Sequence, residues 1–241
     1  MKYTLTLLCA LAAASLHAGP IALSGDVNIT SNLATEPGNQ TFFNNLLGAG
    51  TQVLIRTTPG WGSYATAVEI HYDSVPGVSA SQVGAVTAAS LVGVNLFVGI
   101  TSGTAYTAAE VAALTAFSAG GGRILLMGEN QAFPTENGVV NALLAALGSS
   151  LRIGAVDFDY GFHDAIGAQI VPGALSAGVV SLNYAAPSNV LGGTAVFRSA
   201  DLAHAFVAHE GFDVPEPASL VLSFAGLLLL VILRRRRYAG P

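Results

Sequence analysis

Two carboxylates and one amide stand where a parallel sheet would present them to a ligand. Asp26 follows the first apolar run of the chain, and Glu129 and Asn130 follow the run Arg123–Met127. Because parallel sheets place ligands at the carboxyl ends of their strands, these three residues are predicted to line a pocket. Two carboxyls about 5–10 Å apart could serve as acid and base in hydrolysis of polysaccharide or peptide. Helix capping or a local turn is the alternative for Glu129 and Asn130, and a surface position is the alternative for Asp26 and Arg56.

The densest acidic segment, residues 157–164, contains candidate metal ligands. Asp157 and Asp159 alternate, so their carboxylates would project from one face of an extended chain, and His163 and Asp164 follow a glycine turn. A hard cation such as Ca²⁺ accepts oxygen ligands of this kind, although the segment lacks the pattern of an EF-hand loop. The alternative is a solvated edge whose aromatic side chains turn inward.

Nucleophilic catalysis has little support in the sequence. The only cysteine, Cys9, lies in an apolar run near the N-terminus, so thiol-based chemistry is excluded for the rest of the chain. A serine nucleophile of the Gly-x-Ser-x-Gly type is also missing. Ser63 and Ser102 lie in glycine-rich turns, where serine is common for structural reasons.

Several aromatic residues could stack on sugar rings, or could equally pack in the core. Residues 64–72 read as one stretch with alternating apolar character. The candidates for a carbohydrate platform are Trp61, Tyr64, Tyr72, Tyr106, Tyr160 and Tyr184.

The C-terminal region carries three elements in a fixed order. A Pro-Glu-Pro triplet precedes an uncharged apolar run at residues 218–233, which is followed by four arginines. As a helix, 16 residues span about 24 Å of a hydrocarbon layer that is roughly 30 Å thick. Guanidinium groups favour the cytoplasmic side, and their stems can snorkel to make up the difference. The sequence therefore predicts one transmembrane helix at 218–233, anchored in the inner membrane, with the preceding domain outside the cytoplasm. The signal residues are Pro215, Glu216, Pro217, Arg234, Arg235, Arg236 and Arg237.

This order of elements resembles the PEP-CTERM sorting signal of Gram-negative bacteria. The resemblance covers about a tenth of the chain. It implies a partner, a membrane protease of the exosortase type that cleaves near the Pro-Glu-Pro and passes the protein to the cell surface. It also implies a bacterium that makes exopolysaccharide. An ordinary C-terminal anchor with a chance Pro-Glu-Pro is the alternative.

The N-terminus agrees with export. Lys2 supplies a positive start, residues 5–16 an apolar core, and Ala18 a small residue before a cut at Gly19. The predicted organisation is a signal peptide at 1–18, an exported domain at 19–213 and a sorting and anchor segment at 214–241.

Charge limits the partners of the exported part. Residues 19–216 contain four arginines, no lysine and all fourteen acids, which gives a net charge of about −10. Nucleic acid would be repelled, and anionic polysaccharide would need a bridging divalent cation. No nucleic-acid partner is therefore expected.

The pattern of elements predicts an α/β domain. Apolar strands at 21–27, 52–57, 91–100 and 123–127 alternate with helices at 41–47 and 137–147 and with a helix that the capping box at 107–110 opens. Such alternation is typical of a parallel sheet flanked by helices. Short strands at 151–158, 179–184, 194–197 and 205–208 predict a more antiparallel end.

Residues 91–147 carry a second resemblance. The runs at 94–98, 106–110 and 121–128 give a hydrophobic strand, a Thr-x-x-Glu helix start and a Gly-Gly-x-hydrophobic strand. They resemble the class I glutamine amidotransferase-like fold, which implies a flavodoxin-like parallel sheet and, without the cysteine, no amidotransferase activity.

These observations predict an exported cell-surface or extracellular-matrix protein that is non-enzymatic and linked to exopolysaccharide. Two other functions stay open. One is a carboxylate-dependent hydrolase of polysaccharide or peptide, and the other is a module that binds sugar or calcium.

Overall fold

The computed structural model describes residues 19–212. The predicted signal peptide at 1–18 and the predicted segment at 214–241, including the run 218–233, lie outside the described residues. Within 19–212, no helix combines the length and the apolar character needed to cross a membrane.

Five adjacent parallel strands form the centre of the molecule. Their order across the sheet is β3-β2-β4-β5-β1, and every neighbouring pair is parallel. This confirms the predicted parallel sheet. The strands are β1 (Ile21–Ser24), β2 (Gln52–Arg56), β3 (Ser79–Val83), β4 (Leu96–Gly99) and β5 (Arg123–Met127).

The strand order matches the flavodoxin-like order only in part. If β2 is counted as the first strand, then β3-β2-β4-β5 reads 2-1-3-4, as in the 2-1-3-4-5 order of that fold. The position of the fifth strand is occupied by β1, which comes first in the chain. The parallel α/β architecture is therefore confirmed, whereas the flavodoxin-like assignment is not.

The sheet becomes antiparallel beyond β1, as the short C-terminal strands predicted. The neighbour of β1 is β11 (Ala205–Glu210), which pairs with it in antiparallel register from Ile21↔Glu210 to Ser24↔Val207. The sheet continues with β9 (Ser188–Leu191) and β6 (Arg152–Asp157), and β10 (Thr194–Arg198) branches from it by pairing with β11. A separate antiparallel pair is formed by β7 (Phe162–Ile166) and β8 (Ser181–Ala185).

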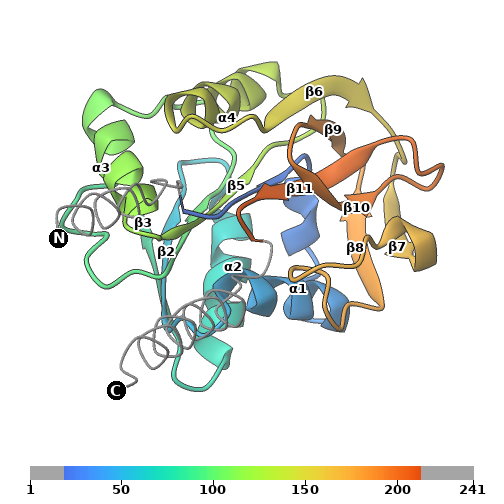
Figure 1. Cartoon of the computed structure of the whole chain (residues 1–241), viewed down its shortest axis with the longest axis horizontal. Helices are drawn as coiled ribbons and strands as arrows, with labels where there is room; N and C mark the ends of the chain where they lie inside the picture. Colours follow the sequence, from blue (N-terminus) through green and yellow to red (C-terminus); the bar gives the residue numbers. More distant parts are fainter. Residues whose placement is uncertain (1–18, 213–241) are drawn as a thin grey trace, which may run out of the picture.

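Helices cover both faces of the sheet (Figure 1). On one face lie α1 (Pro37–Leu47) and α2 (Gly62–Ser74), and on the other lie α3 (Ala108–Ala119) and α4 (Pro134–Ala146). The side chains of β5 alternate accordingly: Leu125 and Met127 pack toward α1 and α2, while Ile124 and Leu126 pack toward α3 and α4. Apolar residues on both faces are what a covered parallel strand requires. Two short 3₁₀ segments, η1 (Val27–Thr30) and η2 (Gly167–Gln169), complete the elements.

Helix α2 corrects the interpretation of residues 64–72 as an alternating stretch. Ala65, Val68 and Tyr72 recur at helical spacing and are fully buried, whereas Ile70 is 59% exposed. The 3-4 spacing of buried residues is the signature of a helix with one buried side. The hydroxyl of Tyr72 donates to the carbonyl of Phe43 at 2.7 Å and so joins α2 to α1.

We call the side where the five parallel strands begin the amino edge, and the side where they end the carboxyl edge. Both ends of the described domain lie at the amino edge. Ile21 pairs with Glu210, and Pro20 lies against Gly211. Phe212 is 6% exposed, and its ring lies 5.9 Å from that of His209.

Candidate functional site

The carboxyl edge brings Asp26 and Glu129 together, as their positions after parallel strands predicted. After β1 the chain bends at Gly25, where a Cβ atom would collide with the carbonyl of Ser188. The bend places Asp26 at the start of η1, where its side chain caps that segment. Glu129 is separated from the end of β5 by Gly128 alone, and its backbone N–H donates to Oδ1 of Asn137 at 2.9 Å.

Asp26 is fully buried and uses both of its carboxyl oxygens. Oδ1 accepts from the backbone N–H of Asn28, and Oδ2 accepts from that of Ala185, each at 2.7 Å. A surface position for Asp26 is therefore wrong. Because Ala185 belongs to β8, this carboxylate joins the end of β1 to the β7–β8 pair.

Glu129 is also buried, at 2% exposure, and it is surrounded by amide donors. Its Oε1 accepts from the backbone and side-chain nitrogens of Asn130 at 3.0 and 2.7 Å, and its Oε2 accepts from Nδ2 of Asn28 at 3.2 Å. Asn130 in turn accepts the N–H of Ala132 at 3.0 Å, which is a local turn. Asn28 thus donates to both carboxyls, which makes Asp26, Asn28 and Glu129 one hydrogen-bonded group.

Burial changes the acidity of this pair. It raises the pKa of Asp26 to about 7, against the opposing hydrogen bonds from Ala185 and Asn28. Burial likewise raises the pKa of Glu129 to about 7, and the nearby charges of Asp26 and Asp157 add to the effect. One of the two carboxyls therefore carries a proton for a large fraction of molecules at neutral pH.

This acidity predicts how stability depends on pH. Between about pH 4 and 7 the folded state binds more protons at Asp26 and Glu129 than the unfolded chain, so the free energy of unfolding should fall as pH rises. The slope is at most about 1.4 kcal/mol per pH unit for each carboxyl. Urea titrations between pH 5 and 8 should show the fall, and Glu129→Gln should reduce the slope by half or more.

The comparison of wild type with Glu129→Gln isolates the carboxyl pair from other titrating groups. Burial lowers the pKa of His71, which gives an opposite slope below about pH 6.5, but this contribution is common to both proteins. Identical pH profiles for the two proteins would contradict the assignment of raised pKa values to this pair.

Half-buried aromatic side chains lie beside the carboxyl pair. The hydroxyl of Tyr64 donates to Oδ1 of Asn28 at 3.3 Å, and burial together with Glu129 and Asp26 raises the pKa of that hydroxyl. The ring centroid of Trp61 lies 5.7 Å from that of Tyr64 and 5.2 Å from that of Phe133. Sequence reasoning missed Phe133, although its place just before α4, at the carboxyl edge, was a signal that could have found it.

The other aromatic candidates lie elsewhere. Tyr72 and Tyr184 are fully buried, and the hydroxyl of Tyr184 donates to Asp159 at 2.6 Å. Tyr160 is 74% exposed. The structure therefore gathers Trp61 and Tyr64 of the predicted platform, with Phe133 as a third member.

The carboxylates of residues 157–164 are directed to separate hydrogen-bond donors. Asp157 accepts the N–H of Gln131 and the hydroxyl of Ser188. Asp159 accepts the N–H of Ala200 at 2.9 Å in addition to Tyr184. Asp164 accepts Nδ2 of Asn183 at 2.9 Å, and Nε2 of His163 lies 2.9 Å from the carbonyl oxygen of Tyr160. Within residues 19–212, no group of three or more His, Cys, Asp or Glu side chains is arranged to hold a metal ion.

Arg56 is buried, so the interpretation of this arginine as a surface residue is wrong. It is 1% exposed, and its Nε lies 3.3 Å from Oε1 of Glu110. Its guanidinium lies 3.9 Å from the ring centroid of Tyr106 and donates to the carbonyl of Thr104 at 3.3 Å. The capping box of α3 was predicted and is present. Its glutamate has a second role that the sequence did not reveal, as the counter-ion of a buried arginine.

The two candidate serines, Ser63 and Ser102, lie in different parts of the structure. Oγ of Ser102 is 2.9 Å from both the hydroxyl of Thr58 and the backbone nitrogen of Thr104, so it organises the turn after β4. Ser63 is exposed in the first turn of α2 and lines a cavity of about 370 Å³ between α1 and α2.

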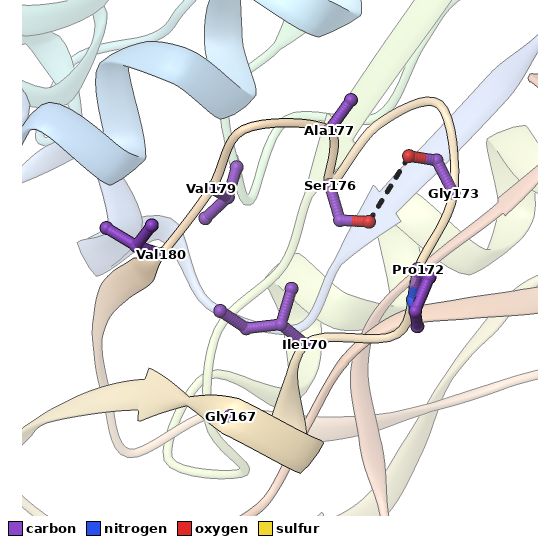
Figure 2. Close-up of a pocket in the computed structure, with 8 residues that line it drawn as sticks. All are labelled: Gly167, Ile170, Pro172, Gly173, Ser176, Ala177, Val179 and Val180. Carbon is purple, nitrogen blue, oxygen red and sulfur yellow. Dashed lines mark hydrogen bonds between the residues drawn. The ribbon is translucent and has the colours of Figure 1, made fainter.

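The largest of the described cavities lies in the loop before β8 and is lined by few polar groups. It has a volume of about 540 Å³ and is lined by glycines and aliphatic side chains, among them Ile170 and Val179 (Figure 2). Its one hydroxyl, that of Ser176, donates to the carbonyls of Val171 and Gly173. This cavity is therefore suited to an apolar group and offers no acid, base or nucleophile.

Comparison with known proteins gives a family match that lies outside the described residues 19–212. Residues 213–237 match the family model of the PEP-CTERM protein-sorting motif. No curated protein and no solved structure matches the chain. The match includes the Pro-Glu-Pro triplet, the apolar run and the four arginines, so the resemblance seen in the sequence is confirmed. The chain therefore carries a PEP-CTERM sorting motif, which marks an exported protein that is membrane-anchored until a membrane protease of the exosortase type processes it.

Proposed function

We propose that this chain is a non-enzymatic protein of the cell surface or extracellular matrix, whose α/β domain is displayed after cleavage and associates with exopolysaccharide. One observation carries the proposal. The sorting motif begins at residue 213, directly after Phe212, the last of the residues that the structure describes. The domain is therefore the cargo that the motif delivers.

The state of the carboxyl pair supports a non-catalytic role. A general acid or base must come within about 3 Å of the proton that it transfers. Asp26 and Glu129 are 0% and 2% exposed, and their oxygens already accept hydrogen bonds from Asn28, Asn130 and Ala185. The pair holds strand ends together, and reaching a substrate would require these bonds to open.

A carboxylate-dependent hydrolase is the second candidate, because one observation favours it. Two neighbouring carboxyls with pKa values near 7 provide one protonated and one ionised group at neutral pH, which acid–base hydrolysis needs. The half-buried rings of Trp61 and Phe133 lie on the same edge and could hold a sugar.

One experiment separates the two candidates. The released protein should co-sediment with exopolysaccharide purified from the same bacterium, and the polymer should keep its length. Dextran is the control for unspecific retention, and a parallel run with EDTA tells direct contact from cation bridging of acidic partners. Formation of new reducing ends that Glu129→Gln abolishes would favour the hydrolase. Failure to sediment with the polymer, with or without Ca²⁺, would contradict the proposed association.

A further inference from the structure

The fold holds the chain firmly up to the residue before the sorting motif. Phe212 is 6% exposed, and the guanidinium of Arg123 lies 5.6 Å from its ring centroid. Arg123 is itself fixed at the end of α1, where it donates to the carbonyl of Leu46 at 2.9 Å. The point from which the motif leaves the domain is therefore a defined place on the amino edge.

The connection from that place to the apolar run is short compared with the domain. Five residues separate Phe212 from the run that begins at residue 218, so an extended connection spans at most about 20 Å. A domain of about 190 residues has a radius of gyration of about 16 Å and a diameter of roughly 40 Å. The connection is attached at the amino edge and is shorter than the domain is wide. The carboxyl edge therefore cannot rest on the membrane, because the amino edge would then lie farther from the membrane than the connection can reach.

Charge favours the same arrangement. At the amino edge, Arg123 and Arg152 are balanced by two carboxylates, Asp73 and Glu210. At the carboxyl edge, the acidic residues outnumber the two arginines, which are Arg56, buried and paired with Glu110, and Arg198, where β10 ends. Anionic lipid headgroups repel the acidic edge and tolerate the balanced one. The acids at the carboxyl edge are Asp26, Glu110, Glu129, Glu136 and Asp157.

We propose that the anchored protein lies with its amino edge against the bilayer surface, so that the carboxyl edge faces away from it. The edge that contains the buried Asp26–Glu129 pair and the half-buried rings of Trp61, Tyr64 and Phe133 then faces outward while the anchor is in place. This inference rests on the proposed function, because it requires anchoring through the sorting motif.

Helix α3 offers a matched pair of positions for a test. Ala109 and Ala119 are both exposed, near opposite ends of this helix, and lie about 15 Å apart along its axis. Ala109 is at the carboxyl edge and Ala119 at the amino edge. The only native cysteine is Cys9, in the predicted signal peptide, so Ala109→Cys and Ala119→Cys each add one thiol to the exported domain.

The test uses the full chain in inner-membrane vesicles from cells that lack the processing protease. Each variant is labelled with a thiol-reactive fluorophore and quenched by lipids that carry a spin label on the headgroup. Labelled Ala119→Cys should be quenched several-fold more strongly than labelled Ala109→Cys. Wild type treated in parallel reports any label on Cys9.

A longer connection provides the control. A Gly-Ser insertion of twenty residues after Asp213 adds a flexible chain with an end-to-end distance of about 25 Å, and the difference in quenching should then become smaller. Equal quenching of the two variants without the insertion, in protein that pellets with the vesicles, would overturn the orientation and leave the sorting function intact. Protein that is missing from the vesicles would overturn both.

Discussion

Replacing Pro215 and Pro217 with alanine should leave the protein uncleaved and bound to the membrane. Each proline fixes its own φ and restricts the residue before it, so the sequence predicts an extended triplet, the form in which a protease binds a chain. Alanine restores two N–H groups and has the highest helix propensity, so it favours extension of the helix predicted at 218–233 through the triplet. Fractionation followed by immunoblotting for the domain should show the full-length species in the membrane, where wild type gives a shorter, released species.

Pro172→Ala is the matched control, because Pro172 is an exposed proline of the folded domain, far from the motif in sequence. This variant should be cleaved and released like wild type. If the Pro215 and Pro217 double variant were also released at the wild-type rate, the sorting part of the proposed function would be refuted.

Glu110→Ala should lower the free energy of unfolding of this domain by about 3–5 kcal/mol. The substitution leaves the guanidinium of Arg56 buried without its counter-ion, and it removes the acceptor of the Val86 N–H and of the Thr107 N–H. Domains of this size are stable by only about 5–15 kcal/mol, so the variant should approach unfolding. Urea titration should show a lower midpoint with an unchanged slope.

Two further variants separate the lost ion pair from the lost helix cap. Glu136 occupies the first turn of α4 as Glu110 does that of α3, and Glu136→Ala should cost only a few tenths of a kcal/mol. Glu110→Gln keeps an acceptor for the cap but leaves Arg56 unpaired, so adding Arg56→Met should restore part of its stability. A double variant less stable than Glu110→Gln alone would show that the buried charge is not the cause.

The ionisation of Glu110 follows from the same contacts. Burial opposes its charge, but hydrogen bonds from Thr107 and Val86, together with Arg56, lower its pKa overall. A lowered pKa in the folded state contributes stability above the unfolded value near 4, and this contribution is lost as pH falls through the folded value. The Glu110 contribution thus has the opposite sign of pH dependence from that of Asp26 and Glu129, and it lies in a more acidic range.

The parallel half of the fold could be predicted because its local signals agree. The run Arg123–Met127 is apolar on both faces and forms β5 with the predicted bounds. Thr107 and Glu110 form the predicted capping box. Helix α2 was missed for two reasons. Its N-cap residue, Trp61, has no side chain that could accept a capping hydrogen bond, and its exposed Ile70 interrupts the helical spacing of apolar residues.

The candidate site was predictable in its location and not in its burial. Both acids follow parallel strands, so their meeting at the carboxyl edge follows from topology. The burial of Asp26 involves Ala185, which donates to it, is 159 residues away in the chain and belongs to the antiparallel part. The burial of Arg56 depends on Glu110 and Tyr106 in the same way. Single-sequence patterns report neighbours along the chain, so contacts of this range cannot be obtained from them.

The contact between Pro20 and Gly211 has a consequence for engineering. Because the two ends of the folded domain touch, a linker of a few residues could join them into a closed loop, and new ends could be opened at an exposed turn such as the one at Gly161. The same closeness lets the domain be inserted as a cassette into a surface loop of an unrelated host protein, where it would separate the two flanking residues of the host by little more than the width of one strand pair.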